Sequence, residues 1–303
     1  MTVRAGGVST EDHIIPVPGA PDVLVRLYRP PGQQPGERPI PVLITFFGGA
    51  FVMGSIDDQQ NEYLAERRCL AGDVLVAAVQ YTTAPEVRCP GPVLQGLAVL
   101  EHLRNQAAAL GVDTSLMMLG GQSAGANIAT AVALEDARRR HLPASEPHLT
   151  GDRDTTGATV PDPVRLILEA PVLDLSAGSI DPSAPNDMGL SASEYLAYRT
   201  QVRDRYLGPG ADPRDPLASP LWHPAIELAP PVLLLAAQDD PLRGDAEAFH
   251  DRLLSASVHV VMAVMRGLTH DGFRDVTGSP AARLWHDIVD RELQEAGGAS
   301  DQR

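Results

Sequence analysis

The chain of 303 residues has only two cysteines, Cys69 and Cys89, and this scarcity excludes a disulfide framework. It also has no C-x-x-C motif and no two histidines four residues apart, the spacings expected of a redox dithiol or a zinc site. We therefore expect both thiols to be buried packing groups, and we expect neither a metal ion nor any other cofactor.

Basic residues and long apolar stretches are also scarce. The 24 Lys and Arg residues are outnumbered by 39 Asp and Glu residues, so the formal net charge is −15. This charge repels nucleic-acid phosphates and anionic lipid, and no long basic stretch opposes it. No segment approaches the roughly 20 apolar residues that span a bilayer, and Met1–Pro18 does not resemble a signal peptide. We expect a cytoplasmic protein that acts on a small molecule, with no nucleic-acid or membrane partner.

Short apolar runs alternate with helical patterns along the chain, and this alternation is typical of a parallel sheet with helices on both faces. The length fits a single α/β domain over residues 1–303. The expected strands are Val42–Phe46, Val74–Val79, Leu116–Leu119, Val164–Leu168, Val232–Ala237 and Val258–Val264. The expected helices are Gln59–Leu70, Val93–Leu110, Ala124–Arg140, Ala192–Leu207, Asp245–Ser255 and Ala281–Glu295.

Three segments depart from this alternation. His13–Pro16 and Val23–Tyr28 predict an antiparallel hairpin that makes the sheet mixed. The Pro- and Gly-rich stretch His141–Pro163 is typical of a surface loop. An insertion around residues 176–220, together with residues 1–40, is predicted to form a small helical cap over the carboxyl edge of the sheet.

The motif Gly121-Gln122-Ser123-Ala124-Gly125 lies between an expected strand and an expected helix. A serine at such a turn presents its hydroxyl above the sheet, and the glycines allow the tight bend. The same letters also occur in ordinary glycine-rich turns that cap a helix. The strand and helix on either side favour Ser123 as a nucleophile.

A serine nucleophile needs a histidine base that is oriented by a carboxylate, in the chain order Ser, acid, His. Asp240 follows one late strand and directly precedes a proline, so we assign it as the acid and keep Asp239 as the alternative one residue away. His270 alone among the nine histidines follows a late strand in a glycine-containing loop. The predicted catalytic residues are Ser123, Asp240 and His270.

The oxyanion of an acyl transfer needs backbone N–H donors. Small residues after the strand Val42–Phe46, in Phe47-Gly48-Gly49-Ala50, allow a close approach to a substrate oxygen. Together with the residue after the nucleophile, this indicates an oxyanion hole built by Gly49, Ala50 and Ala124, although a tight turn without a catalytic role would look similar. The candidate substrate contacts are Phe47, Phe51, Gln122, Tyr195 and Tyr198.

With these motifs the chain resembles the hormone-sensitive-lipase-like carboxylesterases of the α/β-hydrolase fold, from about Pro41 to the C-terminal helix. Tyr81–Glu86 and Asp215–Pro220 are similar to two further motifs of that family. The resemblance implies hydrolysis of a small to medium carboxylic ester through an acyl-enzyme, without metal or cofactor. Relatives often pair through the last strand and helix, so the sequence leaves a homodimer open.

The chain also departs from the family pattern around the oxyanion site. Phe47 replaces a histidine, Ala50 a glycine, Gln122 an acidic residue and Thr82 an arginine, and Asp271 is an extra residue after His270. A histidine at position 47 would hold the loop by hydrogen bonding, whereas Phe47 holds it only by packing.

These departures keep two other functions open. One is a non-hydrolytic biosynthetic enzyme, such as a lyase, cyclase or acyltransferase, because one fold supports many reactions. The other is a ligand-binding protein on a retired hydrolase fold, which the intact set of Ser123, Asp240 and His270 argues against. The identity of the substrate depends on cap packing that the sequence does not fix.

Overall fold

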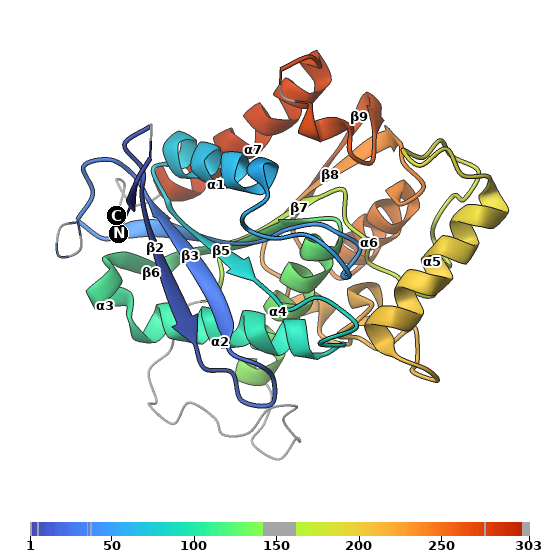
Figure 1. Cartoon of the computed structure of the whole chain (residues 1–303), viewed down its shortest axis with the longest axis horizontal. Helices are drawn as coiled ribbons and strands as arrows, with labels where there is room; N and C mark the ends of the chain where they lie inside the picture. Colours follow the sequence, from blue (N-terminus) through green and yellow to red (C-terminus); the bar gives the residue numbers. More distant parts are fainter. Residues whose placement is uncertain are drawn as a thin grey trace.

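The computed structural model describes residues 2–4, 6–34, 36, 38–141, 162–275 and 277–298. Its centre is a sheet whose strands, among these residues, follow the order β1-β2-β3-β5-β4-β6-β7-β8-β9 (Figure 1). The strands are β1 Thr2–Val3, β2 Ser9–Ile15, β3 Val23–Arg29, β4 Ile40–Phe46, β5 Leu75–Gln80, β6 Val112–Gln122, β7 Arg165–Glu169, β8 Val232–Asp239 and β9 Val260–Thr269.

The sheet is mixed, as predicted. Strands β1, β2 and β3 pair antiparallel and join β5, whereas β5, β4 and β6 to β9 run parallel to one another. The central strands carry mainly apolar residues on both faces, because helices cover both sides of the sheet. In β4, for example, Val42, Ile44 and Phe46 are all buried.

Helices form a layer on each face of the sheet (Figure 1). Helices α1 and α7 pack together on one face, and α2 and α4 pack together on the other. The helices are α1 Gln59–Gly72, α2 Gly91–Asn105, α3 Ala107–Leu110, α4 Ala124–His141, α5 Ala192–Leu207, α6 Arg243–Ser255 and α7 Pro280–Gly298. None of the helices in the described part of the chain is long and apolar enough to cross a membrane.

Three expectations need correction or limits. The helix expected over Val93–Leu110 is interrupted at Gln106, where the backbone leaves helical geometry (φ −101°, ψ 12°). No glycine or proline at this position indicates the break in the sequence. Residues 1–40 were expected to contribute to a cap, but β2 and β3 lie in the sheet, where β3 pairs with β5 and β2 pairs with β3. Of the loop expected at His141–Pro163, residues 142–161 lie outside the described residues.

Candidate active site

Ser123 lies on a sharp turn between β6 and α4. Its backbone adopts a left-handed conformation (φ 51°), which is uncommon for any residue other than glycine. A Cβ atom on Gly121 would lie 2.5 Å from the carbonyl carbon of Gly125, and one on Gly125 would lie 2.1 Å from the Phe46 oxygen. The two glycines therefore let the turn close against β4, and the serine side chain is lifted above the sheet.

The structure brings Ser123, Asp240 and His270 together from the carboxyl ends of the parallel strands β6, β8 and β9. His270 Nε2 lies 3.0 Å from Ser123 Oγ, and His270 Nδ1 lies 2.8 Å from Asp240 Oδ2. Asp240 is buried, and its other oxygen accepts a hydrogen bond from the Leu242 N–H. Asp239, the alternative acid, instead lies in the β8–β9 ladder opposite Thr269.

The carboxylate of Asp240 sets the protonation pattern of His270. Because a carboxylate only accepts, Nδ1 carries the proton, and Nε2 is left as the acceptor for the serine hydroxyl. Burial disfavours the imidazolium, but the charges of Asp240, Asp271 and Asp187 outweigh it and raise the pKa of His270 above its ordinary value. The histidine is thus poised as a base whose protonated form is stabilised.

A buried polar network underlies the turn that carries His270. Trp285 stacks on Phe273 (ring centroids 5.0 Å apart) and donates a hydrogen bond from Nε1 to Glu169 Oε2 (2.6 Å). His286 Nε2 lies 2.8 Å from the Phe273 carbonyl oxygen, and its Nδ1 lies 2.8 Å from an Arg68 guanidinium nitrogen. Since Arg68 only donates, His286 accepts at Nδ1 and donates at Nε2.

Charges inside this network are paired. Arg68 contacts Asp290 at 2.6 Å and Glu169 at 3.3 Å, and all three side chains are largely buried. Burial and the neighbouring Arg68 lower the pKa of His286, so that its ring stays neutral. The Glu169 carbonyl also accepts the Ser123 N–H (2.9 Å), so one residue contacts the serine turn and supports the histidine turn. The sequence analysis missed this network.

The loop after β4 has the backbone shape of a donor site. Gly49, Ala50 and Phe51 have φ values of 142°, 51° and 63°. A Cβ atom on Gly49 would lie 2.0 Å from the Met53 oxygen, so this position excludes a side chain. The N–H groups of Gly49, Ala50 and Ala124 have no acceptor among the residues that the structure describes. They are therefore free to bind a substrate oxygen.

Aromatic stacking holds this loop in place. Phe47 stacks on Tyr81 with ring centroids 4.2 Å apart, and the Tyr81 hydroxyl donates to the Phe47 carbonyl (3.1 Å). Phe51 stacks in the same way on Tyr206 of α5, at 4.0 Å. Phe47 and Phe51 are both buried, and a tyrosine covers one face of each ring.

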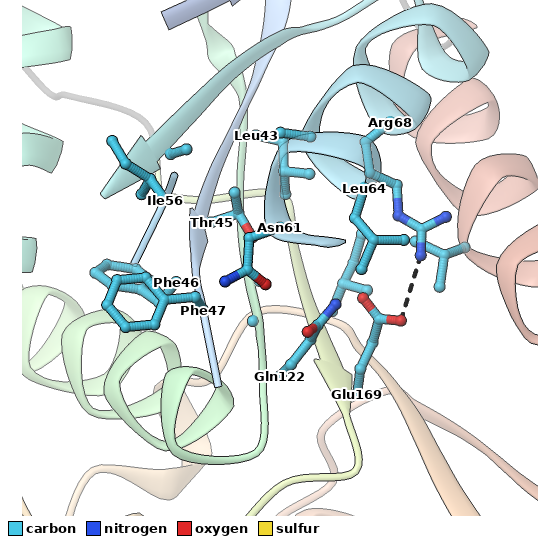
Figure 2. Close-up of a pocket in the computed structure, with 16 residues that line it drawn as sticks. Leu43, Thr45, Phe46, Phe47, Ile56, Asn61, Leu64, Arg68, Gln122 and Glu169 are labelled. Atoms are coloured by element: carbon cyan, nitrogen blue, oxygen red, sulfur yellow. Dashed lines mark hydrogen bonds and ion pairs between the residues drawn. The ribbon is translucent and has the colours of Figure 1, made fainter. Parts of the chain in front are cut away.

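Gln122 lines a cavity on the α1 side of the sheet. Its side chain converges there with Asn61 of α1 and Glu169 of β7 (Figure 2). The cavity has an empty volume of about 580 Å³, which includes space open to solvent. Gln122 Oε1 is buried and has no hydrogen-bond partner among the described residues. Gln122 thus faces away from the insertion that carries α5.

The insertion around residues 176–220 touches all three loops of the site. Its Asp187 accepts the Asp271 N–H next to His270 (2.9 Å), and its Asp181 N–H donates to the Pro241 carbonyl next to Asp240 (3.0 Å). Tyr206 contacts the loop after β4, as described above. Of the candidate substrate contacts on α5, Tyr195 is buried and Tyr198 is half-buried.

The two cysteines take no part in this site. Cys69 is buried as expected, whereas Cys89 is only half-buried, because it lies in the connection before α2. Burial raises the pKa of both thiols to about 12, which keeps them protonated. In the part of the chain that the structure covers, no three His, Cys, Asp or Glu side chains form a metal-binding group.

Comparison with known proteins agrees with this geometry. A family model described as alpha/beta hydrolase fold matches residues 43–274. The chain is 31% identical over 250 residues to an ethyl acetate hydrolase of Pseudomonas putida, which covers 82% of this chain and 71% of that protein. It is 26% identical over 282 residues to the carboxylesterase NlhH of Mycobacterium tuberculosis, covering 90% and 78%. A bacterial heroin esterase superposes with a TM-score of 0.80 at 26% identity, over 96% of this chain and 85% of that one.

Proposed function

The chain belongs to the alpha/beta hydrolase fold family, and we propose that it is a carboxylic-ester hydrolase that forms an acyl-enzyme on Ser123. The predicted fold and the resemblance to the hormone-sensitive-lipase-like carboxylesterases are confirmed by the family match and by the esterase relatives. The observation that carries the mechanism is the chain of two short contacts from Ser123 through His270 to Asp240.

In the first step the Ser123 oxygen attacks the carbonyl carbon of the ester, and His270 Nε2 takes the hydroxyl proton. The carbonyl electron pair moves to the oxygen, and the N–H groups of Gly49, Ala50 and Ala124 stabilise the resulting negative charge. Asp240 keeps the imidazole in the required tautomer and stabilises the imidazolium that forms.

In the second step the carbonyl re-forms and the bond to the alcohol oxygen breaks, while His270 gives its proton to the departing alkoxide. Water then attacks the acyl-enzyme, again with His270 as the base. The second tetrahedral intermediate releases the carboxylic acid, and the proton returns to Ser123. No metal or cofactor takes part in these steps.

The contacts of residues 176–220 with the loops after β4, β8 and β9 support the proposal that this insertion forms a cap over the site. A small to medium ester remains the proposed substrate class. The exposed Val261 and Val264 on the edge strand β9 fit the homodimer left open by the sequence. A cytoplasmic location stays a prediction.

The test is hydrolysis of a short-chain nitrophenyl ester by the wild-type protein, the Ser123→Ala variant and a Ser255→Ala control at an exposed serine of α6. We expect Ser123→Ala to lower kcat/KM by roughly four to six orders of magnitude, and Ser255→Ala to leave it unchanged. Intact-mass spectrometry of the quenched wild-type reaction is expected to show one acyl adduct, which Ser123→Ala lacks. Absence of both turnover and adduct in the wild type would favour the non-hydrolytic alternative.

A further inference from the structure

The buried face of helix α5 lies toward two loops of the site. These are the acid loop, which follows β8 and carries Asp240, and the oxyanion loop, which follows β4 and carries Gly49 and Ala50. Helix α5 lies apart from the other helices, at one side of the molecule (Figure 1). Near its C-terminal end, Tyr206 stacks on Phe51. Near its N-terminal end, burial raises the pKa of Tyr195. The charge of Arg199 lowers this pKa, and the charge of Asp240 raises it further. Arg199 lies on the same face, four residues after Tyr195 and seven before Tyr206, and therefore between these two contacts.

Arg199 is a buried cation that has no partner among the described residues. The residue is only 8% exposed. Its Nε atom is fully buried and has no hydrogen-bond acceptor among the described residues. Nor does its guanidinium form an ion pair within the part of the chain that the structure covers. A buried guanidinium normally binds a carboxylate or another acceptor, because burial removes the water that would otherwise solvate it.

The charge of Arg199 acts on the carboxyl group of Asp245, but the two side chains form no hydrogen bond or ion pair within the described part of the chain. Asp245 is fully buried, and its Oδ2 accepts the N–H groups of Leu173 (2.9 Å) and Asp174 (3.1 Å). Its Oδ1 has no partner among the described residues. Burial raises the pKa of Asp245 to about 7, against the opposing charge of Arg199. At neutral pH this carboxyl group is therefore only partly ionised.

These observations describe a buried cation on the face of α5 that carries Tyr195 and Tyr206, with a hydrogen-bond donor that has no acceptor among the described residues. The planar guanidinium fork matches the two oxygens of a carboxylate. The rest of the molecule repels anions, since its net charge is −15, so an anionic substrate needs a local cation to be held. We infer that Arg199 binds a carboxylate group of the substrate, and that the enzyme acts on esters that carry a negative charge. This inference rests on the ester-hydrolase function proposed above.

The carboxylate of the substrate can lie on the acyl side or on the alcohol side of the ester. Two pairs of probe esters distinguish these positions. For the acyl side, we compare the mono-nitrophenyl ester of glutaric acid with the neutral ester that has an isopropyl group in place of the carboxylate. For the alcohol side, we compare the butanoate ester of glycolic acid with isobutyl butanoate. In each pair the measured quantity is the ratio of kcat/KM for the charged ester to that for the neutral ester.

The variant is Arg199→Met, and the control is Arg205→Met, which removes the same charge from the exposed face of the same helix. We expect Arg199→Met to lower the charged-to-neutral ratio by about 10- to 100-fold in one of the two pairs, the range for hydrogen bonds to charged groups. Arg205→Met is expected to leave both ratios within about twofold. An unchanged ratio in both pairs, or an equal fall for charged and neutral esters, would overturn the inference.

Two further measurements separate this inference from folding and from the proposed reaction. If Arg199→Met does not fold, the double variant Arg199→Met/Asp245→Asn removes both buried charges, and the same loss of ratio is expected. Calorimetric binding of the glutaric acid monoester to Ser123→Ala, with and without Arg199→Met, does not require turnover. If binding depends on Arg199 but the wild-type protein hydrolyses none of the esters, the proposed reaction is refuted and the anion site is supported. Equal binding by the two proteins would refute the anion site.

Discussion

The oxyanion loop and the histidine loop both approach Ser123, but different forces hold them. Phe47 and Phe51 fix the oxyanion loop by stacking on Tyr81 and Tyr206, with almost no charge involved. The histidine loop, which follows β9 and carries His270, instead lies on a buried polar network. This network consists of Arg68, Glu169, Trp285 and His286. The carboxylates of Asp271 and Asp187 add negative charge beside His270.

This difference indicates which perturbations each loop senses. Stacking is governed by shape and apolar area, so the oxyanion loop is expected to respond to volume and to be insensitive to pH and salt. A buried ionic network depends on every member being paired, because removal of one partner leaves another charge buried alone. The histidine loop is therefore expected to respond to charge. The following variants test this contrast.

The largest effect is expected from Arg68→Met in the polar network. It leaves Glu169 and Asp290 without their buried cation and is expected to lower the free energy of unfolding by about 3–5 kcal/mol. Urea denaturation measures this loss. The control is Arg67→Met, because Arg67 is more exposed than Arg68 and its removal leaves Asp290 paired with Arg68. We expect it to cost about 1 kcal/mol or less. Equal losses of unfolding free energy in both variants would show that the burial of Arg68 does not determine its contribution to stability.

The next effect is expected from Gly49→Ala in the oxyanion loop. The added methyl group would collide with the Met53 carbonyl at 2.0 Å, so the loop must move and its N–H donors with it. We expect kcat to fall by about two to three orders of magnitude, with the pH profile unchanged. Gly32→Ala is the control, because Gly32 also has a positive φ (81°) but open space around it. A small effect of Gly49→Ala on kcat would remove this residue from the oxyanion hole.

The smallest expected effect is a shift in the pH dependence of kcat/KM, which a variant of the histidine loop shows and a variant of the oxyanion loop does not. Catalysis needs neutral His270, and the neighbouring acids raise its pKa, so kcat/KM of the wild type is expected to rise with pH through a value above the ordinary one. Asp271→Asn removes one of these charges, lowers the pKa of His270 and shifts the acid limb to lower pH. Phe47→Leu removes a stacking contact and is expected to lower stability by about 1 kcal/mol without moving that limb.

Asp251→Asn, at an exposed acid of α6, is the matched control for the charge change. Kinetic titration of all three variants decides the comparison. A shift of the acid limb in Phe47→Leu, or none in Asp271→Asn, would mean that the two loops do not differ in the way described.

Much of the candidate site could be anticipated because its signals are local. A strand, a G-x-S-x-G turn and a helix follow directly in the sequence around Ser123, and parallel strands bring Asp240 and His270 to the same edge. The effect of replacing a family histidine by Phe47 also followed from side-chain chemistry, since a phenyl ring has only packing to offer.

The supporting network had no such signal. Arg68 and His286 are 218 residues apart, and Glu169 and Trp285 are 116 apart, so only the folded chain brings them together. The interruption of the helix at Gln106 likewise depends on tertiary packing that outweighs local propensity.

The tight turn at Ser123 also has a consequence for protein engineering. A random library that includes Gly121 or Gly125 would consist largely of non-folding clones, because even one methyl group at either position meets backbone atoms within 2.5 Å. No neighbouring side chain can move to relieve such a collision, since both partners are main chain. We therefore expect new specificities to be found more readily by varying the buried side chains of α5, because no backbone collision is involved there.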